Sequence, residues 1–408
     1  MLTPDDRDLI ARDRAVPGLA TLLDGEALGE LLSDFLTPLG GVRVEYLRYK
    51  PGTSLTCGLV LDTPSGVVRA FGVAASADFA MKLPKMTGLY RRGLHRPLAS
   101  AAADHVVVST MENDPALPGL RGGMHGLHRA LPDGLAEGRL RVVRYRPLRR
   151  AVTVVDVGGV PAAVVRVVEP KAVDAHLRRL RAAVAEQLPV PRELGHSRRR
   201  GIIATAYVAG TVAENGVTDH ATQTLAGAVL ADWHARPGHV RLPQVDAINS
   251  LVTTAALVGE LVPGLESDAA SLARSVAGRL SATGADQRRL VHGDFSIDQL
   301  VRTATHVTVL DLDRVRQDAP EWDAATWFAA EVLAGHVPPT ADPEDVLAPL
   351  LAAYREAGGA DLRPDLRLYA AAALLLRAGE PFRLRRPEWA HRAAEIVRAA
   401  SGLAAVPA

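Results

Sequence analysis

The chain has 408 residues, of which 48% are hydrophobic and 23% are charged, and its formal net charge is +1. This length predicts two or three domains or lobes, and the near-neutral charge gives no reason to expect nucleic acid or an anionic membrane as a partner. The single cysteine, Cys57, excludes an internal disulfide and a cysteine-based zinc site. The charged N-terminus does not read as a signal peptide, and no uncharged stretch reaches the roughly 18 apolar residues of a membrane span, so we expect a cytoplasmic protein.

Two hairpins of similar sequence are predicted in the first half of the chain. LRYKPGTSLTCGLVLDTPSGVVRAFGV begins at Leu47, and VRYRPLRRAVTVVDVGGVPAAVVRVV begins at Val143. Each has an Arg-Tyr-basic-Pro start, a β-branched run, a turn and a second apolar run, which is the pattern of a β-hairpin. Arg69 and Arg166 lie at nearly equal distances from the two starts. The pattern predicts a duplicated β-module, and chance similarity between two Arg- and Val-rich hairpins is the alternative.

The rest of the chain is predicted to change from strands to helices. The Gly-, Pro- and Asp-rich stretch 113–134 is expected to be a connection, and the apolar spacing after Lys171 predicts a helix. RGIIATAYVAGT then predicts a buried strand. From Thr218 onwards helical spacing dominates, except for short strands expected at 290–313. The order is therefore a mostly β half followed by a mostly α half with a small β insert.

Oxygen-bearing side chains gather in this β insert. Asp294 and Gln299 lie on the loop within VHGDFSIDQL, Asp311 ends the strand VTVLD, and Asp313 follows it. A carboxylate and an amide oxygen, with water and phosphate in the other positions, suit Mg²⁺, and a further carboxylate can orient an attacking hydroxyl. Phosphoryl transfer needs these parts. A structural strand–loop–strand with solvated acids is the alternative.

These motifs resemble those of the aminoglycoside phosphotransferase and choline kinase-like superfamily, which are small-molecule kinases with a protein-kinase-like fold. VHGDFSIDQL and VLDLDRVRQDAPEWDAATW are similar to its His-Gly-Asp loop and to its two later aspartate segments, and a weaker resemblance extends over residues 140–400. The loop glutamine and the extra N-terminal segment are similar to the maltokinase-like branch found in actinobacteria. The resemblance implies an α/β (α+β) bilobal fold with an accessory β-containing module at 1–130, a mostly β small lobe at 131–209 and a mostly helical large lobe at 210–408.

The resemblance also implies roles for individual residues of the loops. Asp294 would be the catalytic aspartate that faces the acceptor hydroxyl. Gln299 stands where most relatives have asparagine and would bind Mg²⁺ together with Asp311. Asp323 would brace the catalytic loop, and His292 would be a structural residue of that loop.

On the nucleotide side the sequence departs from the family pattern. Arg166 stands where the family presents a lysine to the ATP phosphates, and arginine keeps the charge but differs in reach and geometry. Glu186 would be its partner on the following helix, and Tyr207, Val208 and the residues up to Gly210 would form the hinge that receives adenine. A structural ion pair for Arg166 and a solvated helix face for Glu186 are the alternatives.

The predicted reaction is ATP- and Mg²⁺-dependent transfer of the γ-phosphoryl group to a hydroxyl of a small molecule, with a sugar or an aminoglycoside-like metabolite as the expected acceptor. Three other functions stay open. One is a kinase of a Ser or Thr hydroxyl on a natural-product precursor peptide, and another is a non-catalytic, pseudokinase-like binding module in which Arg166 and Gln299 mark lost activity. The third is a purely structural scaffold, which would show no nucleotide dependence and no effect of Asp294→Asn. No nucleic acid or membrane partner is expected, and the sequence predicts no oligomeric state.

Overall fold

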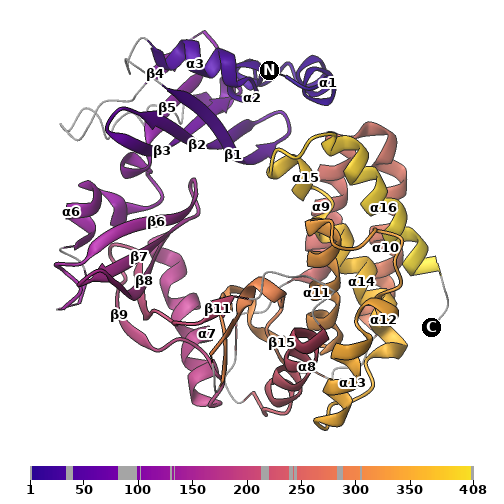
Figure 1. Cartoon of the computed structure of the whole chain (residues 1–408). Helices are drawn as coiled ribbons and strands as arrows, with labels where there is room; N and C mark the ends of the chain where they lie inside the picture. Colours follow the sequence, from indigo (N-terminus) through magenta and orange to yellow (C-terminus); the bar gives the residue numbers. More distant parts are fainter. Residues whose placement is uncertain are drawn as a thin grey trace. The chain divides into compact units, whose positions relative to one another are not determined.

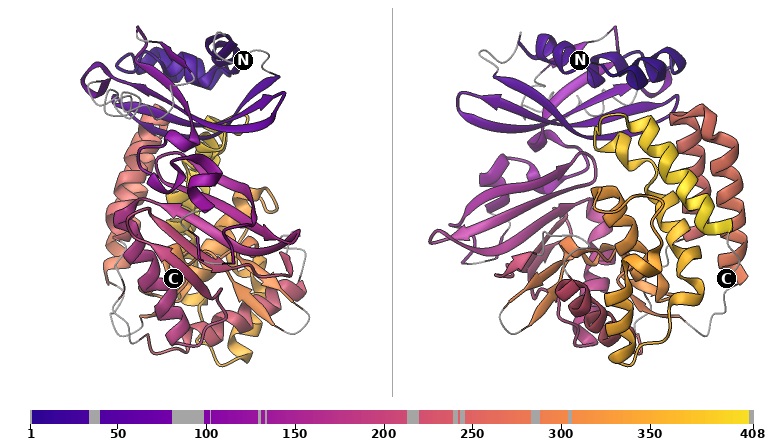
Figure 2. Two further views of the ribbon diagram at one scale, coloured as in Figure 1. Left: turned by 90° about the vertical axis from the view of Figure 1, so that its left-hand side faces the viewer. Right: turned by 45° about the vertical axis from the view of Figure 1, so that its right-hand side comes forward.

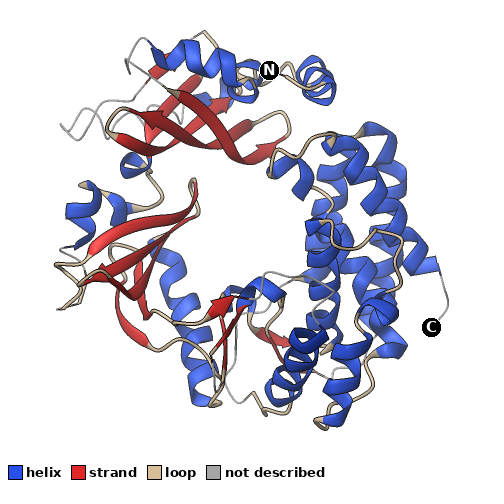
Figure 3. Ribbon diagram, viewed as in Figure 1, coloured by secondary structure: helices blue, strands red, loops and turns tan. Residues whose placement is uncertain are grey.

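The computed structural model divides the chain into two compact units. The first comprises Met1–Asp174, Glu193–Tyr207 and Pro381–Ala390, and the second comprises Ala175–Arg192, Val208–Glu380 and His391–Ala408. The structure describes residues 2–33, 40–80, 99–101, 103–128, 131–132, 134–212, 220–238, 242, 246–282, 288–303 and 306–405. Strands are concentrated in the first unit and helices in the second (Figure 3), so the predicted mixed α/β composition is confirmed. None of the described helices combines the length and apolar character that crossing a membrane requires.

The first unit contains an N-terminal antiparallel sheet packed against short helices. In the described residues this sheet has the strand order β1-β2-β3-β5-β4 (Figure 1). α2 buries Leu19, Leu22 and Leu23, and Gly72 in β3 leaves the space that Leu22 occupies. The elements are α1 (Pro4–Arg12), α2 (Leu19–Leu23), α3 (Gly25–Ser33), β1 (Gly41–Lys50), β2 (Ser54–Thr63), β3 (Gly66–Ala75), α4 (Ala77–Ala80), β4 (Ala99–Ala101) and β5 (Val106–Thr110).

A second antiparallel sheet in the same unit repeats this arrangement. Its strand order in the described residues is β6-β7-β8-β10-β9, which is the order of the first sheet with each strand replaced by its counterpart. Phe71 and Val73 of the first sheet and Val165 and Val167 of the second share one hydrophobic core. Its strands are β6 (Arg139–Arg146), β7 (Arg150–Val157), β8 (Val160–Val168), β9 (Glu193–Ser197) and β10 (Ile202–Ala206).

The two hairpin turns repeat each other in their side-chain contacts. Tyr49 Oη donates to Asp13 Oδ2 at 2.6 Å, and Tyr145 Oη donates to Asp114 Oδ2 at 2.8 Å. Three residues after each tyrosine, the backbone N–H of Gly52 or Leu148 donates to the same carboxylate oxygen, at 2.9 and 2.8 Å. Both of these turn residues have positive φ, at 62° and 58°. Such matched geometry supports the predicted duplicated module over chance similarity.

The stretch 113–134, expected to be only a connection, is partly helical. Its described part begins at the last residue of η2 (Met111–Asn113) and contains η3 (Pro118–Leu120) and α6 (Gly123–His128). Gly and Pro were read as breaks, but Pro118 begins η3, where its missing N–H costs no hydrogen bond. This stretch also carries the fully buried Asp114, and so it anchors the second hairpin instead of merely joining the sheets.

A segment far along the chain completes the first unit through a buried ion pair. Asp6 of α1 is fully buried and accepts from Arg385 Nη1 at 2.7 Å, from Arg385 Nη2 at 3.0 Å and from Trp389 Nε1 at 3.2 Å. Burial alone would raise the pKa of Asp6. The hydrogen bonds and positive charge of Arg385, together with hydrogen bonds from Thr3, hold this pKa below its ordinary value. Asp6 therefore stays ionised and ties α1 to the segment Pro381–Ala390.

The second unit is a helical assembly around one large hydrophobic core. α9 and α10 lie side by side in it, as the right-hand view of Figure 2 shows, and both contact α14. Trp322 and Trp327 are buried. The helices are α7 (Val173–Ala185), α8 (His220–His234), α9 (Ala247–Leu261), α10 (Glu266–Ala282), α11 (Glu321–Ala334), α12 (Pro343–Val346), α13 (Ala348–Glu356), α14 (Arg363–Arg377) and α16 (Trp389–Ala405). α15 (Glu380–Arg383) belongs, after its first residue, to the segment of the first unit described above.

The predicted β insert of the second unit is confirmed as two small sheets. β12 pairs with β15, and β13 pairs with both β11 and β14, all antiparallel. The loop between β12 and β13 and the segment after β14 are therefore brought together by strand pairing. The strands are β11 (Thr211–Val212), β12 (Arg289–Val291), β13 (Leu300–Arg302), β14 (Val307–Val309) and β15 (Arg316–Asp318).

Candidate active site

The loop that carries Asp294 begins with a glycine that no other residue could replace without strain. Gly293 has a backbone φ of 78°, a conformation that residues other than glycine rarely adopt. A Cβ at this position would lie 2.6 Å from Arg314 O and 2.1 Å from Arg316 Nη1. The glycine of the His-Gly-Asp motif therefore allows the loop to turn closely against the segment that follows β14.

The helix α11 holds this loop by accepting its backbone N–H groups. Asp323 is fully buried and accepts from His292 N at 2.8 Å and from Gly293 N at 2.6 Å. His234 Nε2 lies 3.0 Å from the same carboxylate. Burial alone would raise the pKa of Asp323, but the hydrogen bond and charge of His234, with the other donors, keep it below its ordinary value. The predicted brace is confirmed.

The same helix also holds the loop on the other side of Asp294. Thr326 Oγ1 donates to Phe295 O at 3.1 Å. Arg316, which is buried, lies across the ring of Trp322 and donates to Asp318 at 2.8 Å and, at 3.4 Å, to Gly293 O. The backbone immediately before and after Asp294 is thus fixed by buried hydrogen bonds, and its carboxylate is 33% exposed.

Gln299 and Asp311 are brought together by the pairing of β13 and β14. Leu300 pairs with Val309, and Leu310 N donates to Gln299 O at 2.8 Å. His292 Nε2 bonds Leu310 O at 2.8 Å, which gives His292 the structural role expected of it. Asp311 itself has the left-handed values φ 55° and ψ 63°, a strained conformation for an aspartate that is common at functional sites. One amide oxygen and one carboxylate oxygen on adjoining strand ends fit a hard cation that takes its other ligands from phosphate and water.

Two arginines from different elements approach the Asp294 carboxylate. Arg377, in the last turn of α14, donates from Nη2 to Asp294 Oδ1 at 2.6 Å. Arg314, at the end of η8 (Leu312–Arg314), has its Nε 3.7 Å from Asp294 Oδ2. Arg377 Nη1 also lies 3.8 Å from Glu380 Oε2. The sequence analysis did not identify either arginine as a site residue.

Asp313, which follows the strand end of Asp311, pairs with a histidine of a neighbouring helix. Its Oδ1 lies 2.9 Å from His176 Nδ1 of α7. Beside this pair Arg179 donates from Nε to Val315 O at 3.1 Å. The two contacts hold the segment after Asp311 against α7.

The residues predicted for the nucleotide side are divided between the two units. Arg166 of β8 pairs with Val152 and Ile203, and it lies on the sheet face opposite the shared core. Tyr207 is 38% exposed, and its N–H donates to Ala162 O at 3.0 Å. These two belong to the first unit, whereas Glu186, just after α7, and Val208 belong to the second. Their joint action on a nucleotide stays a prediction.

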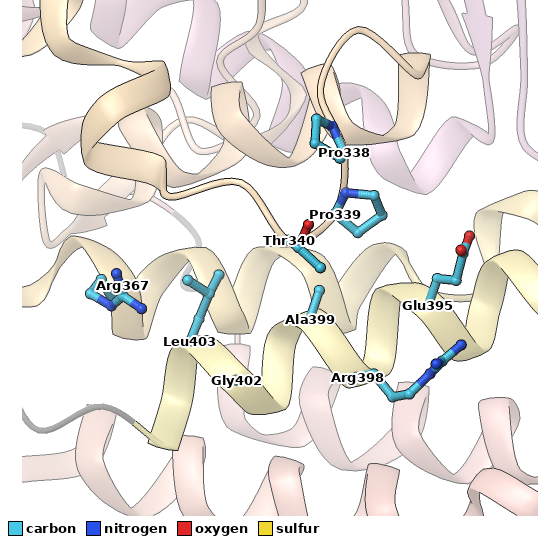
Figure 4. Close-up of a pocket in the computed structure, with 9 residues that line it drawn as sticks. All are labelled: Pro338, Pro339, Thr340, Arg367, Glu395, Arg398, Ala399, Gly402 and Leu403. Atoms are coloured by element: carbon cyan, nitrogen blue, oxygen red, sulfur yellow. The ribbon is translucent and has the colours of Figure 1, made fainter.

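A separate surface pocket of about 520 Å³ lies in the second unit (Figure 4). The loop 338–340 and α16 form most of it, and none of the predicted site residues lines it. Its residues are Pro338, Pro339, Thr340, Arg367, Glu395, Arg398, Ala399, Gly402 and Leu403. The candidate active site therefore rests on the loop geometry around Asp294 and not on this pocket.

His234 and Arg316 also support the site, and the sequence analysis did not assign them to it. His234 of α8 connects Asp323 with Tyr354, whose Oη lies 2.9 Å from its Nδ1. The available signal was weak, since a histidine in an apolar helix is more often a packing residue. For Arg316, the sequence offered only its position between the segments of Asp311 and Asp323 as an indication of a role in the site.

Comparison with known proteins places these loops in a family. Residues 148–375 match the phosphotransferase enzyme family. A choline/ethanolamine kinase family protein from Mesorhizobium loti has a similar structure, with a TM-score of 0.52 at 16% identity over 73% of this chain and 96% of that one. A choline kinase from Streptococcus pneumoniae gives a TM-score of 0.49 at 13% identity, over 65% of this chain and 93% of that one.

A putative aminoglycoside phosphotransferase from Ralstonia eutropha gives a TM-score of 0.46 at 18% identity, over 69% of this chain and 94% of that one. The search of curated proteins found no match. The likeness to the Mesorhizobium loti structure confirms the expected kinase-like mixed α/β fold. Because the family match spans more than half of the chain and includes the loops around Asp294, Asp311 and Asp323, the chain belongs to the phosphotransferase enzyme family.

Proposed function

We propose that the protein transfers the γ-phosphoryl group of ATP to a hydroxyl of a small molecule, a sugar or an aminoglycoside-like metabolite. The observation that carries this proposal is the position of Asp294. Its backbone is held on both sides by α11 through Asp323 and Thr326, and its loop is tied by His292 to the strand end that leads to Asp311. A partly exposed carboxylate on a fixed loop suits a reaction in which positioning supplies most of the catalysis.

In this reaction the acceptor oxygen bonds to the γ-phosphorus as the bond between that phosphorus and the bridging oxygen of ADP breaks. Asp294 orients the acceptor hydroxyl and takes up its proton. Gln299 and Asp311 would hold Mg²⁺, which when bound neutralises charge on the phosphate oxygens. The left-handed backbone of Asp311 supports this role, because strained residues gather at functional sites.

Four residues are proposed to bind the nucleotide. Arg166 takes the lysine role towards the phosphates, since guanidinium can donate two parallel hydrogen bonds to them. Glu186 orients Arg166, and the backbone of Tyr207 and Val208 receives the adenine. The central-strand position of Arg166, on the face turned away from the shared core, supports this assignment.

The narrower parts of the resemblance belong to the same proposal. Residues 1–130 would act as an accessory module, 131–209 as the small lobe and 210–408 as the large lobe. The glutamine at position 299 and the N-terminal repeat of the small-lobe sheet support a place in the maltokinase-like branch. A reaction that consumes ATP would take place in the cytoplasm.

The proposal is tested by calorimetric titration of Mg-ATP into the full-length protein and into the Asp311→Ala variant. We expect Mg²⁺-dependent binding by the wild type and its loss in the variant. Asp345→Ala, which removes an exposed carboxylate of α12, is the matched control and should bind as the wild type does.

A screen of hydroxyl compounds by ADP release then identifies the acceptor, and precursor peptides are included in it. A phosphorylated peptide, detected by mass spectrometry, would transfer the proposal to a peptide acceptor. Absence of Mg-ATP binding by the wild type would refute the phosphotransferase proposal and favour a non-catalytic binding module.

A further inference from the structure

The carboxylate proposed to face the acceptor is itself flanked by positive charge. Arg377 approaches one of its oxygens and Arg314 the other, at 2.6 and 3.7 Å. They come from elements far apart in the chain, because Arg377 is 83 residues from Asp294 and Arg314 follows the strand end of Asp311. Two guanidinium groups therefore converge on the place where an acceptor hydroxyl would lie.

The two arginines differ in how much of their charge is available to a ligand. Arg377 is 19% exposed and lies between two carboxylates, those of Asp294 and Glu380. Its position at the C-terminal turn of α14 further stabilises its cation. The side chain of Arg314 is 55% exposed, and its 3.7 Å separation from Asp294 is too long for a hydrogen bond. Arg314 consequently presents the more accessible positive charge beside the reacting position.

This arrangement has a direct consequence for the charge of the acceptor. An ammonium group of a ligand bound against Asp294 would face two guanidinium groups at short range, and like charges placed together cost affinity. A neutral hydroxyl compound meets no such penalty, and an anionic group beside the hydroxyl would gain from Arg314. In an acceptor site that selects polycations, carboxylates would be expected in place of these arginines.

We propose that Arg314 and Arg377 exclude polycationic acceptors, so that the protein phosphorylates a neutral or anionic hydroxyl compound. The inference rests on the proposed function and narrows it, from sugars and aminoglycoside-like compounds together to sugars and their acidic derivatives. Arg314 is the residue that selects the acceptor by charge, and Arg377 also positions Asp294.

The test measures the binding of kanamycin, a hydroxyl-rich polycation, to the full-length protein without nucleotide. It compares the wild type, Arg314→Glu and the control Arg355→Glu, an equal charge reversal at an exposed position of α13. We expect Arg314→Glu to bind kanamycin about tenfold more tightly than both the wild type and the control, the order of effect of reversing one charge near a bound amine. Arg377→Gln, which removes a charge without reversing it, should give a smaller gain in the same direction.

A gain of less than about threefold for Arg314→Glu over Arg355→Glu would overturn the inference. Tight binding of kanamycin by the wild type would overturn it as well. So would the absence of detectable kanamycin binding by both Arg314→Glu and Arg377→Gln. Thermal unfolding of each variant verifies that it is folded, and Arg377→Gln provides the second measurement if Arg314→Glu is not. Because kanamycin is titrated without nucleotide, the result is independent of Mg-ATP binding, whose absence would refute the phosphotransferase proposal separately.

Discussion

The buried carboxylate of Asp323 is expected to be one of the largest single contributions to the stability of the second unit. It accepts from two backbone N–H groups of the loop before Asp294 and lies 3.0 Å from His234 Nε2. Asp323→Ala leaves both backbone donors and the histidine without this partner in a site closed to water. The substitution therefore removes a hydrogen-bonded centre and not only a surface charge.

The size of the effect follows from these contacts. Each buried donor left without an acceptor costs about 1–3 kcal/mol, and loss of one partner of a buried charged network costs about 3–5 kcal/mol in total. We expect Asp323→Ala to lower the free energy of unfolding by about 4 kcal/mol. For a unit of this size that corresponds to a decrease in Tm of about 10 °C. Asp323→Asn retains one oxygen acceptor and should cost about half as much.

Thermal and urea unfolding, followed by circular dichroism, measure this loss. Asp268→Asn, which neutralises an exposed carboxylate of α10, is the control and should change stability by about 0.5 kcal/mol or less. A loss below about 1 kcal/mol for Asp323→Ala would refute the argument, because it would mean that water or a rearranged side chain satisfies the loop donors.

Three further predictions concern the pH dependence, the repeated module and the reaction. Burial raises the pKa of Glu321 to about 7, so the free energy of unfolding falls as pH rises from the ordinary value of 4.5 to about 7. Glu321→Gln should therefore stabilise the protein by about 2 kcal/mol at pH 8 and have little effect at pH 5, as measured by urea unfolding. Tyr145→Phe should lower the free energy of unfolding by about 1–2 kcal/mol, because its partner Asp114 is fully buried. Tyr49→Phe should cost less, because its partner Asp13 is only half-buried. Equal losses for the two variants in urea unfolding would contradict this prediction. Asp294→Asn should retain Mg-ATP binding by calorimetry while kcat for ADP release falls roughly 10²- to 10⁴-fold, and unchanged turnover would exclude Asp294 as the base.

Features encoded in short stretches of sequence were predictable. The hairpins at Leu47 and Val143 follow from alternation and turn residues, and both form in the structure. The loop with Asp294 and the strand end with Asp311 follow from the spacing of the motif. The stretch 113–134 was misread because Gly and Pro indicate a local break but not whether short helices form around it.

The sequence by itself therefore determined the chemistry that is available: a glycine-turned loop with Asp294, an amide and a carboxylate at Gln299 and Asp311, and a brace at Asp323. Only the tertiary structure decided what surrounds these groups. Arg377 and His234 reach their carboxylates across 83 and 89 residues of chain, through the packing of α14 and α8. The physical reason is that hydrophobic and turn patterns describe neighbours along the chain, whereas the partner of a charged side chain is selected by which helices share a core.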